Sequence, residues 1–579
     1  MISFSKKEHY FTLGLFTLLW LYIIIRAFTV FYVHDEIVSK WAYMIDWNYI
    51  PYEGYIDANN HFLNSFLGGL FIRLFNSDSI FIVRLANVLA FPIFFWSIVA
   101  FKEFFQKKAN FFLFLIGISC THFILDFYSL ARGYGLAWSF MLFALYCSAK
   151  NLKSTKTYWT LLTVVAWILC IYANLSYLPL SVIGIVYMLL YSLYHKKVFD
   201  SLLYLSSAIP IYYFLAYSLQ LQSIGKLYLG SANDFFKTVV HPLSEYIFFT
   251  ASIFIDAVVL IMCIGVVVYI FKRLLKEFNI FTPTLLFPIL FCLTIASVFV
   301  QNWILDINYP ENRSATHLYI LLIGAIAFIS QDERFKKLIY ALILILFGFF
   351  CSHLNFNNTQ VYAYEHFDPK LLTKIPEYTE GIPTSTGGRF WTADNELART
   401  LDLPLRSNQD SPKPSDTIVD YLITFEEVRP NILDTYHEVY VDELSELTLY
   451  KRNKFLKREK KEENTVVFDN KDLYINLISD LTNRPCFIRC KGKLEGMNIY
   501  KDPVAIFTVE DSLSNEKLLY QGVGFSSNAK IDENGEIHFD FSFAIKNYPT
   551  AKMIKVYIYN KKMVPLKGSI TTEVYDISF

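Results

Sequence analysis

Residues 28–61, FTVFYVHDEIVSKWAYMIDWNYIPYEGYIDANNH, decide how the rest of the chain is interpreted. This stretch begins as the end of a long apolar run and continues as a polar segment rich in aromatic residues. His34, Asp35 and Glu36 lie where the two parts meet. Adjacent acidic residues are costly to hold near lipid, and ionisable residues at a membrane span usually mark a functional site. The sequence therefore predicts a membrane protein with a functional site just beyond its first span.

Bulk composition also indicates a membrane protein. Of the 579 residues, 54% are hydrophobic, 18% are aromatic and only 18% are charged, and the mean hydropathy is +0.34. Soluble proteins carry about 25% charged residues. The formal net charge is zero, whereas binding to nucleic acid calls for a basic patch or stripe. We therefore expect no nucleic-acid partner.

Apolar runs of about 20 residues, the length that crosses a bilayer, predict eleven membrane spans. Two of these runs, Tyr134–Ala149 and Thr316–Ser330, are short for a span. A further run, His61–Phe75, is interrupted by glycines and an arginine and is typical of a helix that lies along the interface. The predicted spans are Tyr10–Phe31, Ile80–Phe101, Asn110–Phe127, Tyr134–Ala149, Tyr158–Asn174, Leu178–Tyr194, Ser201–Leu219, Tyr246–Phe271, Phe281–Val300, Thr316–Ser330 and Leu338–Ser352.

The distribution of basic residues predicts the orientation of this membrane domain, residues 1–352. The loops on one side hold sixteen Lys and Arg residues and those on the other side hold six, and positive charge collects on the cytoplasmic side. Lys6 and Lys7 precede an apolar run without a cleavage site, which predicts a retained signal anchor with a cytoplasmic N-terminus. We expect a multi-pass protein of the inner (plasma) membrane whose C-terminal domains are extracytoplasmic.

Beyond the last predicted span the composition becomes that of a soluble protein. Residues 353–464 mix helical patterns with short apolar runs such as Thr417–Phe425 and Leu447–Tyr450, which predicts a small α/β subdomain. This region ends in the charged run Lys454–Asn464, KFLKREKKEEN, which is typical of a solvated linker or helix.

Residues 465–579 contain recurring short runs with β character, bounded by turns. Ile537–Ile545 alternates between apolar and polar residues, and Asn534 and Gly535 before it form a hairpin-type turn pair. Met553–Tyr559 alternates again. The sequence therefore predicts a C-terminal β-sandwich, similar in pattern to carbohydrate-binding sandwiches.

His34, Asp35 and Glu36 offer acid–base chemistry. Transfer of a group onto a hydroxyl needs a carboxylate that takes the hydroxyl proton as the new bond forms. A neighbouring acid or histidine can orient that carboxylate or help to bind a divalent cation. For an isolated acidic pair a solvated helix cap is the alternative, but further polar clusters are predicted on the same face and favour a functional site.

A second polar cluster, DANNH at residues 57–61, lies in the same loop. It combines a carboxylate, two amides and an imidazole just before an apolar helix. Asp and Asn are preferred N-caps of helices, but capping accounts for only one residue of the group. The cluster is therefore a candidate for contacts with a substrate.

Two arginines on the predicted outer face suit a phosphate group. Arg132 lies in SLARGYG, residues 129–135, and its planar guanidinium can make two charge-assisted hydrogen bonds. Arg313 lies in NYPENR, residues 308–313, where the start of the next helix adds partial positive charge. The alternatives are a snorkelling interfacial side chain for Arg132 and a surface pair of Arg313 with Glu311. We expect the two arginines to neutralise one phosphate together.

Other polar residues are weaker candidates. His122, Asp126 and Asp256 lie in spans or at their ends, where they could be packing or relay groups. The long outer loop Gln220–Glu245 could cover the site.

In order and sidedness these features resemble the GT-C superfamily of polyprenyl-phosphate-sugar-dependent membrane glycosyltransferases, which includes protein O-mannosyltransferases and lipid A aminoarabinose transferases. The matching features are the acidic pair after the first span, the segment SLARGYG and the segment YPENR, and the resemblance covers residues 1–450. It implies a GT-C-like fold of about eleven spans. It also implies inverting transfer of a monosaccharide from a polyprenyl-phosphate donor to an extracytoplasmic glycan, lipid or protein acceptor.

The resemblance implies roles for the predicted site residues. Asp35 is the general base, Glu36 is a supporting acid, and Arg132 and Arg313 bind the donor phosphate. Some members use a divalent metal cation near the acidic pair, for which the candidate ligands here are Asp35, Glu36 and His61. The predicted substrate contacts are His34, Asp57, Asn60, His61, Tyr134, Tyr309 and Glu311.

Two other classes of function fit a large membrane protein. A transporter or flippase of lipid-linked glycans would carry polar residues at mid-membrane, in helices broken by Gly or Pro, whereas the polar clusters here lie at the ends of spans. A non-catalytic glycan-binding surface protein would need far fewer spans for anchoring. The sequence therefore favours an enzyme.

Overall fold

The computed structural model of the chain describes residues 4–578 except 155, 228–229, 249, 251, 277–278, 332–334, 380, 389–395, 398, 401–406, 410–417, 426–432, 483, 498–502, 512–513, 515, 526–530 and 549. Chain contacts divide it into two compact units. The first unit comprises Met1–Phe31 and Val38–Val361, and the second comprises Tyr32–Ile37 and Tyr362–Phe579.

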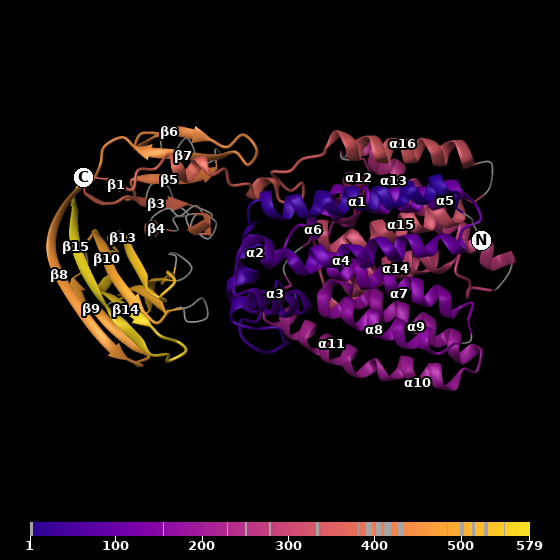
Figure 1. Cartoon of the computed structure of the whole chain (residues 1–579), viewed down its shortest axis with the longest axis horizontal. Coiled ribbons are helices and arrows are strands. Elements are labelled where there is room, and N and C mark those ends of the chain that lie inside the picture. Colours follow the sequence, from indigo (N-terminus) through magenta and orange to yellow (C-terminus); the bar gives the residue numbers. More distant parts are fainter. Residues whose placement is uncertain are drawn as a thin grey trace. The chain divides into compact units, whose positions relative to one another are not determined.

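The first unit is a bundle of helices (Figure 1). Its first helix begins at a capping box, in which Ser5 Oγ accepts the Glu8 N–H at 3.3 Å and the Glu8 carboxylate accepts the Ser5 N–H at 2.7 Å. The α-helices are α1 (Lys6–Thr29), α3 (Phe62–Phe75), α4 (Ile80–Ala100), α5 (Lys108–Ser119), α6 (His122–Tyr128), α7 (Tyr134–Asn151), α8 (Tyr158–Ala173), α9 (Leu178–Tyr194), α10 (Val198–Ser206), α11 (Ala208–Ser223), α12 (His241–Phe248), α13 (Ile253–Lys276), α14 (Leu286–Leu305), α15 (Thr316–Ile329) and α16 (Lys336–Ser352). Shorter 3-10 and π helices are η1 (Ser39–Ile45), η2 (Phe101–Phe104), η3 (Leu175–Tyr177), η4 (Phe236–Val240) and η5 (Asn312–Ala315).

Helices occur at all eleven places where the sequence predicts spans. By length and hydropathy, seven of the described helices could cross a membrane, or eight if the pair α5 and α6, bent by 55°, is one span. The helices α7, α8 and α16 do not meet these length and hydropathy criteria. A multi-pass helical membrane protein is therefore confirmed, whereas the count of eleven and the orientation derived from it stay predictions.

One predicted span begins at the wrong place. The sequence predicts a span over Tyr246–Phe271, but α12 ends at Phe248 and α13 starts only at Ile253. Ser252 is the reason, because its Oγ accepts the Ile255 N–H at 3.3 Å and starts a new helix. The predicted helix His61–Phe75 is present as α3 (Phe62–Phe75), and its position along the interface stays a prediction.

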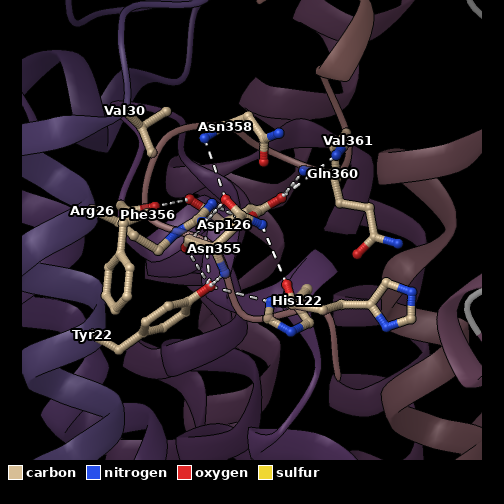
Figure 2. A network of polar contacts seen from close by, with 12 residues as sticks. Tyr22, Arg26, Val30, His122, Asp126, Asn355, Phe356, Asn358, Gln360 and Val361 are labelled. Atoms are coloured by element: carbon tan, nitrogen blue, oxygen red, sulfur yellow. Dashed lines mark hydrogen bonds and ion pairs between the residues drawn. The ribbon is translucent and has the colours of Figure 1, made fainter. Parts of the chain in front are cut away.

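A buried polar network joins three segments of the first unit (Figure 2). Arg26 in the last turn of α1 forms an ion pair with Asp126 of α6. Nη1 of Arg26 also donates to the backbone oxygen of Asn355 at 2.7 Å and to its Oδ1 at 2.8 Å. The second Asp126 oxygen accepts the backbone N–H groups of Gln360, at 2.7 Å, and Val361, at 3.5 Å. The end of α1, helix α6 and the segment after α16 are thereby held together.

A second buried arginine, Arg84 of α4, caps the end of α1. Its guanidinium donates to the carbonyl oxygens of Ala27 at 3.3 Å, Val30 at 2.6 Å and Phe31 at 3.1 Å. The last carbonyl groups of a helix lack partners within the helix, and a basic side chain can satisfy them. This accounts for an arginine inside an otherwise apolar helix.

The second unit contains a mixed sheet of order β4-β3-β5-β7-β6, in which β3 is parallel to β4 and β5 (Figure 1). Strands β5 and β7 lie in the two predicted apolar runs, so the α/β character is confirmed where the structure describes it; residues 410–417 and 426–432 lie outside the described residues. The elements are α2 (His34–Val38), η7 (Ala363–Glu365), α17 (Lys370–Thr373), β1 (Tyr378–Thr379), β2 (Ile382–Pro383), β3 (Ser385–Gly388), β4 (Ser407–Gln409), β5 (Tyr421–Phe425), β6 (Tyr436–Val441) and β7 (Leu447–Arg452).

The predicted β-sandwich is confirmed. Two antiparallel four-stranded sheets, β13-β10-β15-β8 and β12-β11-β14-β9, enclose an apolar core that includes Phe507, Phe541 and Ile570. Alternation along each strand places these residues inside. The strands are β8 (Lys457–Asn470), β9 (Tyr474–Thr482), β10 (Cys486–Glu495), β11 (Val504–Asp511), β12 (Lys517–Gly524), β13 (Ile537–Ile545), β14 (Ala551–Tyr559) and β15 (Leu566–Ser578).

The interpretation of Lys454–Asn464 as a linker or helix is wrong. Lys457–Asn464 is the first half of β8, so the sandwich begins before residue 465. Strand β8 lies at the edge of its sheet and pairs only with β15 within the described residues. Charged side chains protect an exposed sheet edge against pairing with other chains. The charge run therefore belongs to an edge strand, which has the same composition as a solvated linker.

Candidate functional site

The acidic pair lies at the start of a short helix and not in a loop. Glu36 is buried in α2, and its Oε2 accepts the Val33 N–H at 3.2 Å. This contact caps the helix, as the alternative interpretation predicts for one of the two acids. Asp35 is half-buried in the first turn, and the His34 N–H donates to Glu365 Oε2 at 2.8 Å. Asp35 is therefore the more accessible acid and Glu36 shapes the helix that carries it.

Arg132 lies in the loop between α6 and α7 and is buried. Its Nη1 donates to Asn59 Oδ1 and lies 3.5 Å from Ser39 Oγ. Ser39 is the first residue of η1 and follows directly on α2. The predicted phosphate ligand therefore contacts η1 and the DANNH cluster of the 28–61 segment.

Buried amides hold the backbone beside Arg132. Asn64 Nδ2 of α3 donates to the Ala131 oxygen at 2.9 Å, and Asn87 Nδ2 of α4 donates to Asn64 Oδ1 at 2.8 Å. All of these groups are buried, where a hydrogen bond is worth most because no water competes for it. The position of Arg132 is thereby fixed by two helices of the bundle.

The glycine after Arg132 allows the loop to pack closely. A Cβ atom at Gly133 would lie 2.0 Å from the Ala173 oxygen and 2.7 Å from His61 Cβ. Any larger residue would separate these groups, so the close approach of the loop to His61 requires glycine.

His61 is buried, and both predicted phosphate ligands are close enough to affect its pKa. Its ring packs edge-on against Tyr134, with the centroids 5.2 Å apart. Burial, followed by the charges of Arg132 and Arg313, lowers the pKa of His61 well below its ordinary value of 6.5. The imidazole is therefore neutral at physiological pH, and its Nε2 has no hydrogen-bond partner among the described residues. Arg132 and Arg313, far apart in the sequence, act on one buried side chain.

Two further buried groups belong to this site, and the sequence analysis missed both. Tyr246 of α12 has a hydroxyl without a partner among the described residues, and Arg313 is close enough to affect its pKa, which burial raises. Tyr43 of η1 likewise has an unpartnered buried hydroxyl, and its pKa, raised by burial, responds to Asp57 and Arg132. Nothing in the sequence distinguishes these tyrosines from ordinary core residues.

Asp57 and Asn60 have structural partners. Asp57 Oδ2 pairs with Lys226 at 3.0 Å and its Oδ1 accepts the Asn59 N–H at 3.0 Å. Asn60 donates to the Asn48 oxygen at 3.0 Å and its Oδ1 accepts Ser65 Oγ at 2.8 Å. Their predicted contacts with a substrate stay predictions.

Tyr309 and Glu311 also serve the fold. The Tyr309 N–H donates to the Ser231 oxygen at 3.0 Å in an isolated β-bridge, and its ring packs against Phe235. Glu311 is exposed and forms a capping box with Ser314 at the start of η5. The loop Gln220–Glu245, which is predicted to cover the site, therefore contacts Tyr309 through Ser231 and Phe235. It also contacts Asp57 through Lys226.

The described residues do not fit a bound metal. Sequence analysis names Asp35, Glu36 and His61 as candidate ligands. No group of three or more His, Cys, Asp or Glu side chains in the described part of the chain could hold a metal ion. The reaction proposed for this chain uses no metal ion.

An apolar groove of about 680 Å³ lies between α13 and α16. Phe248, at its wall, is two residues from Tyr246 in α12. The lining is almost wholly apolar and includes Phe248, Phe254, Val258, Leu344, Ile345 and Phe349.

Comparisons with known proteins give distant structural matches only. No protein-family model matches the chain, and no curated protein matches it. The apo structure of ArnT from Cupriavidus metallidurans matches at 10% identity and a TM-score of 0.44, covering 76% of this chain and 97% of that one. The same protein bound to undecaprenyl phosphate matches at 9% identity and a TM-score of 0.46, covering 77% and 98%.

The arabinosyltransferase EmbB from Mycobacterium smegmatis matches at 11% identity and a TM-score of 0.34, over 97% of this chain and 64% of that one. At such identities and TM-scores these matches assign neither a substrate nor a role to any residue of this chain.

Proposed function

We propose that the chain is a membrane glycosyltransferase that moves a monosaccharide from a polyprenyl-phosphate donor to an extracytoplasmic acceptor, with inversion. The observation that supports this proposal is the convergence of Arg132 and Arg313 on the buried, neutral His61. In this proposal the protein lies in the inner (plasma) membrane with a cytoplasmic N-terminus, as the distribution of basic residues predicts.

The arginines suit the leaving group of such a reaction. Negative charge grows on the phosphate as the glycosyl–phosphate bond breaks, and positioned cations stabilise that charge most where water is excluded. His61 adds no third positive charge, and its Nε2 can make a hydrogen bond to the donor.

The acidic pair suits the acceptor side. Asp35 would take the proton of the acceptor hydroxyl as that oxygen attacks the anomeric carbon. Attack from the face opposite the phosphate inverts the configuration at this carbon. Glu36 caps α2, so in this proposal it positions the helix that carries Asp35 and does not react.

The lipid part of the donor needs an apolar surface near the phosphate ligands. The groove between α13 and α16 offers one, and it reaches Phe248, close in the chain to Tyr246, which responds to the charge of Arg313. Burial of each methylene of a polyprenyl chain contributes about 0.8 kcal/mol.

Sugar transfer by the full-length protein in nanodiscs, with a panel of synthetic polyprenyl-phosphate monosaccharides, tests the proposal. Release of free polyprenyl phosphate reports on the reaction. We expect Asp35→Asn to lose at least about 100-fold in rate, as removal of a general base does, while donor binding persists. Glu53→Gln, an exposed acid in the same stretch, is the matched control and should keep full activity.

Full activity of Asp35→Asn would remove Asp35 as the base. Movement of lipid-linked glycan across vesicle membranes without any transfer product would favour the transporter instead.

A further inference from the structure

The outer faces of the two sandwich sheets differ. On sheet β13-β10-β15-β8, Arg489 pairs with Asp540 and Glu573, and Lys491 pairs with Glu573 at 2.9 Å. Phe487 on the same face belongs to an apolar cluster with residues of the mixed sheet. This face is occupied by paired charges and by the rest of its own unit.

Sheet β12-β11-β14-β9 carries a group of tyrosines on its outer face instead. Tyr520 lies on β12, Tyr557 and Tyr559 on β14, and Tyr474 on β9. The Tyr474 ring stacks on Tyr559 with the centroids 5.4 Å apart and meets Tyr557 edge-on at 5.6 Å. Tyr474 is 55% exposed and Tyr520 is 50% exposed. We call these four residues the tyrosine face.

Two residues of β11 show how the rings lie. Ile506 and Thr508 alternate with core residues and point away from the core, yet they are only 3% and 1% exposed. In register, Thr508 is opposite Tyr520 and Ile506 is opposite Tyr557. Neighbouring side chains, which in register include Tyr520 and Tyr557, therefore cover this part of β11. Beneath them the Thr508 hydroxyl has no hydrogen-bond partner among the described residues.

The groups around the rings are polar, and the Glu510 carboxylate among them is neutralised by Lys555. Lys555 pairs with Glu510 at 3.0 Å, Lys517 lies over the Tyr520 ring at 4.3 Å, and Asn476 is exposed on β9 opposite Tyr557. A neutral sugar ring has an apolar C–H face that stacks on an aromatic ring and hydroxyl groups that bond to amides and paired charges. An aromatic body with a polar rim is how tyrosine contributes at binding surfaces.

We propose that the tyrosine face binds a neutral glycan chain, with sugar rings stacked on Tyr520 and on the Tyr474–Tyr559 pair. Exposed apolar patches on soluble domains usually mark interaction sites, and paired charges at the rim disfavour an anionic ligand. This site lies within the sandwich and does not depend on the proposed transfer reaction.

Affinity gel electrophoresis of the full-length protein in detergent, against dextran, mannan, xylan and arabinogalactan, tests the proposal. We expect at least one of these neutral polysaccharides to retard the protein. Tyr474→Ala and Tyr520→Ala should each weaken the apparent affinity about tenfold, the loss of one stacking contact. Val467→Ala, an exposed residue on β8 of the other sheet, is the matched control and should change nothing.

Both tyrosines are half-exposed, so the variants should melt at the wild-type temperature, which separates lost binding from lost folding. No retardation by any of the four polysaccharides, or retardation of both tyrosine variants equal to that of wild type, would overturn the proposal. A change of oligomeric state in Tyr474→Ala with unchanged retardation would show a contact between copies and would also overturn it. Asp35→Asn should abolish transfer and keep retardation, so the two proposals fail independently.

Discussion

Two arginine clusters in the membrane unit differ in what surrounds the guanidinium groups. Arg26 is held by the carboxylate of Asp126 and by two oxygens of Asn355, all from its own chain (Figure 2). Arg132 and Arg313 instead act on His61, which is kept neutral.

The polar atoms near Arg132 and Arg313 also differ from those near Arg26 in their hydrogen bonding. His61 Nε2 and the hydroxyls of Tyr43 and Tyr246 are buried and have no hydrogen-bond partner among the described residues. Such atoms are rare in folded proteins, because burial without a partner is costly. The Arg26 network, whose groups are partnered within the chain, is expected to contribute to stability. The polar atoms without partners near Arg132 and Arg313 are instead suited to binding a ligand.

The largest expected effect is on the first cluster. Asp126→Ala leaves Arg26 buried without its carboxylate and should lower the free energy of unfolding by about 3–5 kcal/mol. Thermal unfolding of the purified protein in detergent measures this. Glu8→Gln breaks the solvent-accessible pair of Glu8, at the other end of α1, with Lys108 of α5 and should leave the melting temperature unchanged. Equal melting temperatures for both variants would contradict the structural role of Arg26.

Arg132→Ala should affect activity more than stability. We expect kcat/KM for the donor to fall about 100-fold, or about 2.7 kcal/mol, with a smaller loss of stability than in Asp126→Ala. Arg132→Lys should recover only part of the activity, because lysine keeps the charge without the planar fork. A variant that loses stability but keeps its activity would place Arg132 with Arg26 as a structural residue.

The depressed pKa of His61 makes stability depend on pH in a defined direction. In the unfolded chain His61 gains a proton near pH 6.5, whereas in the folded chain it does so only at a much lower pH. The contribution of His61 to the free energy of unfolding is therefore complete above pH 6.5. It is lost as the pH falls from 6.5 towards the pKa of the folded state, by about 1.4 kcal/mol per pH unit.

Unfolding free energies of wild type and His61→Gln between pH 7.5 and 5.5 measure this contribution, because the difference between the two proteins removes the effect of other histidines. Parallel curves would show that His61 is not neutral in the folded state.

The smallest effect concerns Tyr246. Because its hydroxyl has no partner in the described structure, Tyr246→Phe should keep or slightly raise stability, while donor affinity falls about fivefold for one lost hydrogen bond, or about 1 kcal/mol. Tyr204 is the matched control, since its hydroxyl accepts Asn151 Nδ2 at 2.9 Å. Tyr204→Phe should lower stability and leave donor affinity unchanged; the opposite pattern would falsify the assignment of Tyr246.

Periodicity made much of the fold predictable. Helices form at all eleven apolar runs, and Ile537–Ile545 forms β13 with the predicted bounds, because an alternating strand after a hairpin turn has one favourable arrangement. Strand β8 was not predictable from composition, since Lys and Glu are also typical of linkers. Only pairing with β15 makes the run a strand.

The site was predictable only in part. Adjacent acids and an arginine followed by Gly-Tyr-Gly are local signals, and Arg132 does contact the 28–61 segment. The pairing of Arg26 with Asp126 depends on how α1 and α6 pack, which no local pattern encodes. The importance of Tyr43 and Tyr246 depends on which hydroxyls lack partners, and only the folded chain determines that.

The segment 353–361 affects where the chain can be shortened. The sequence places the domain boundary after Ser352. A truncation there would delete Asn355, Gln360 and Val361. The Arg26–Asp126 pair would then lose its hydrogen bonds to the backbone of these three residues. Ending the polypeptide after Val361 retains them. Moving the end of a shortened chain from Ser352 to Val361 therefore decides whether the buried polar network inside the helix bundle is kept or lost.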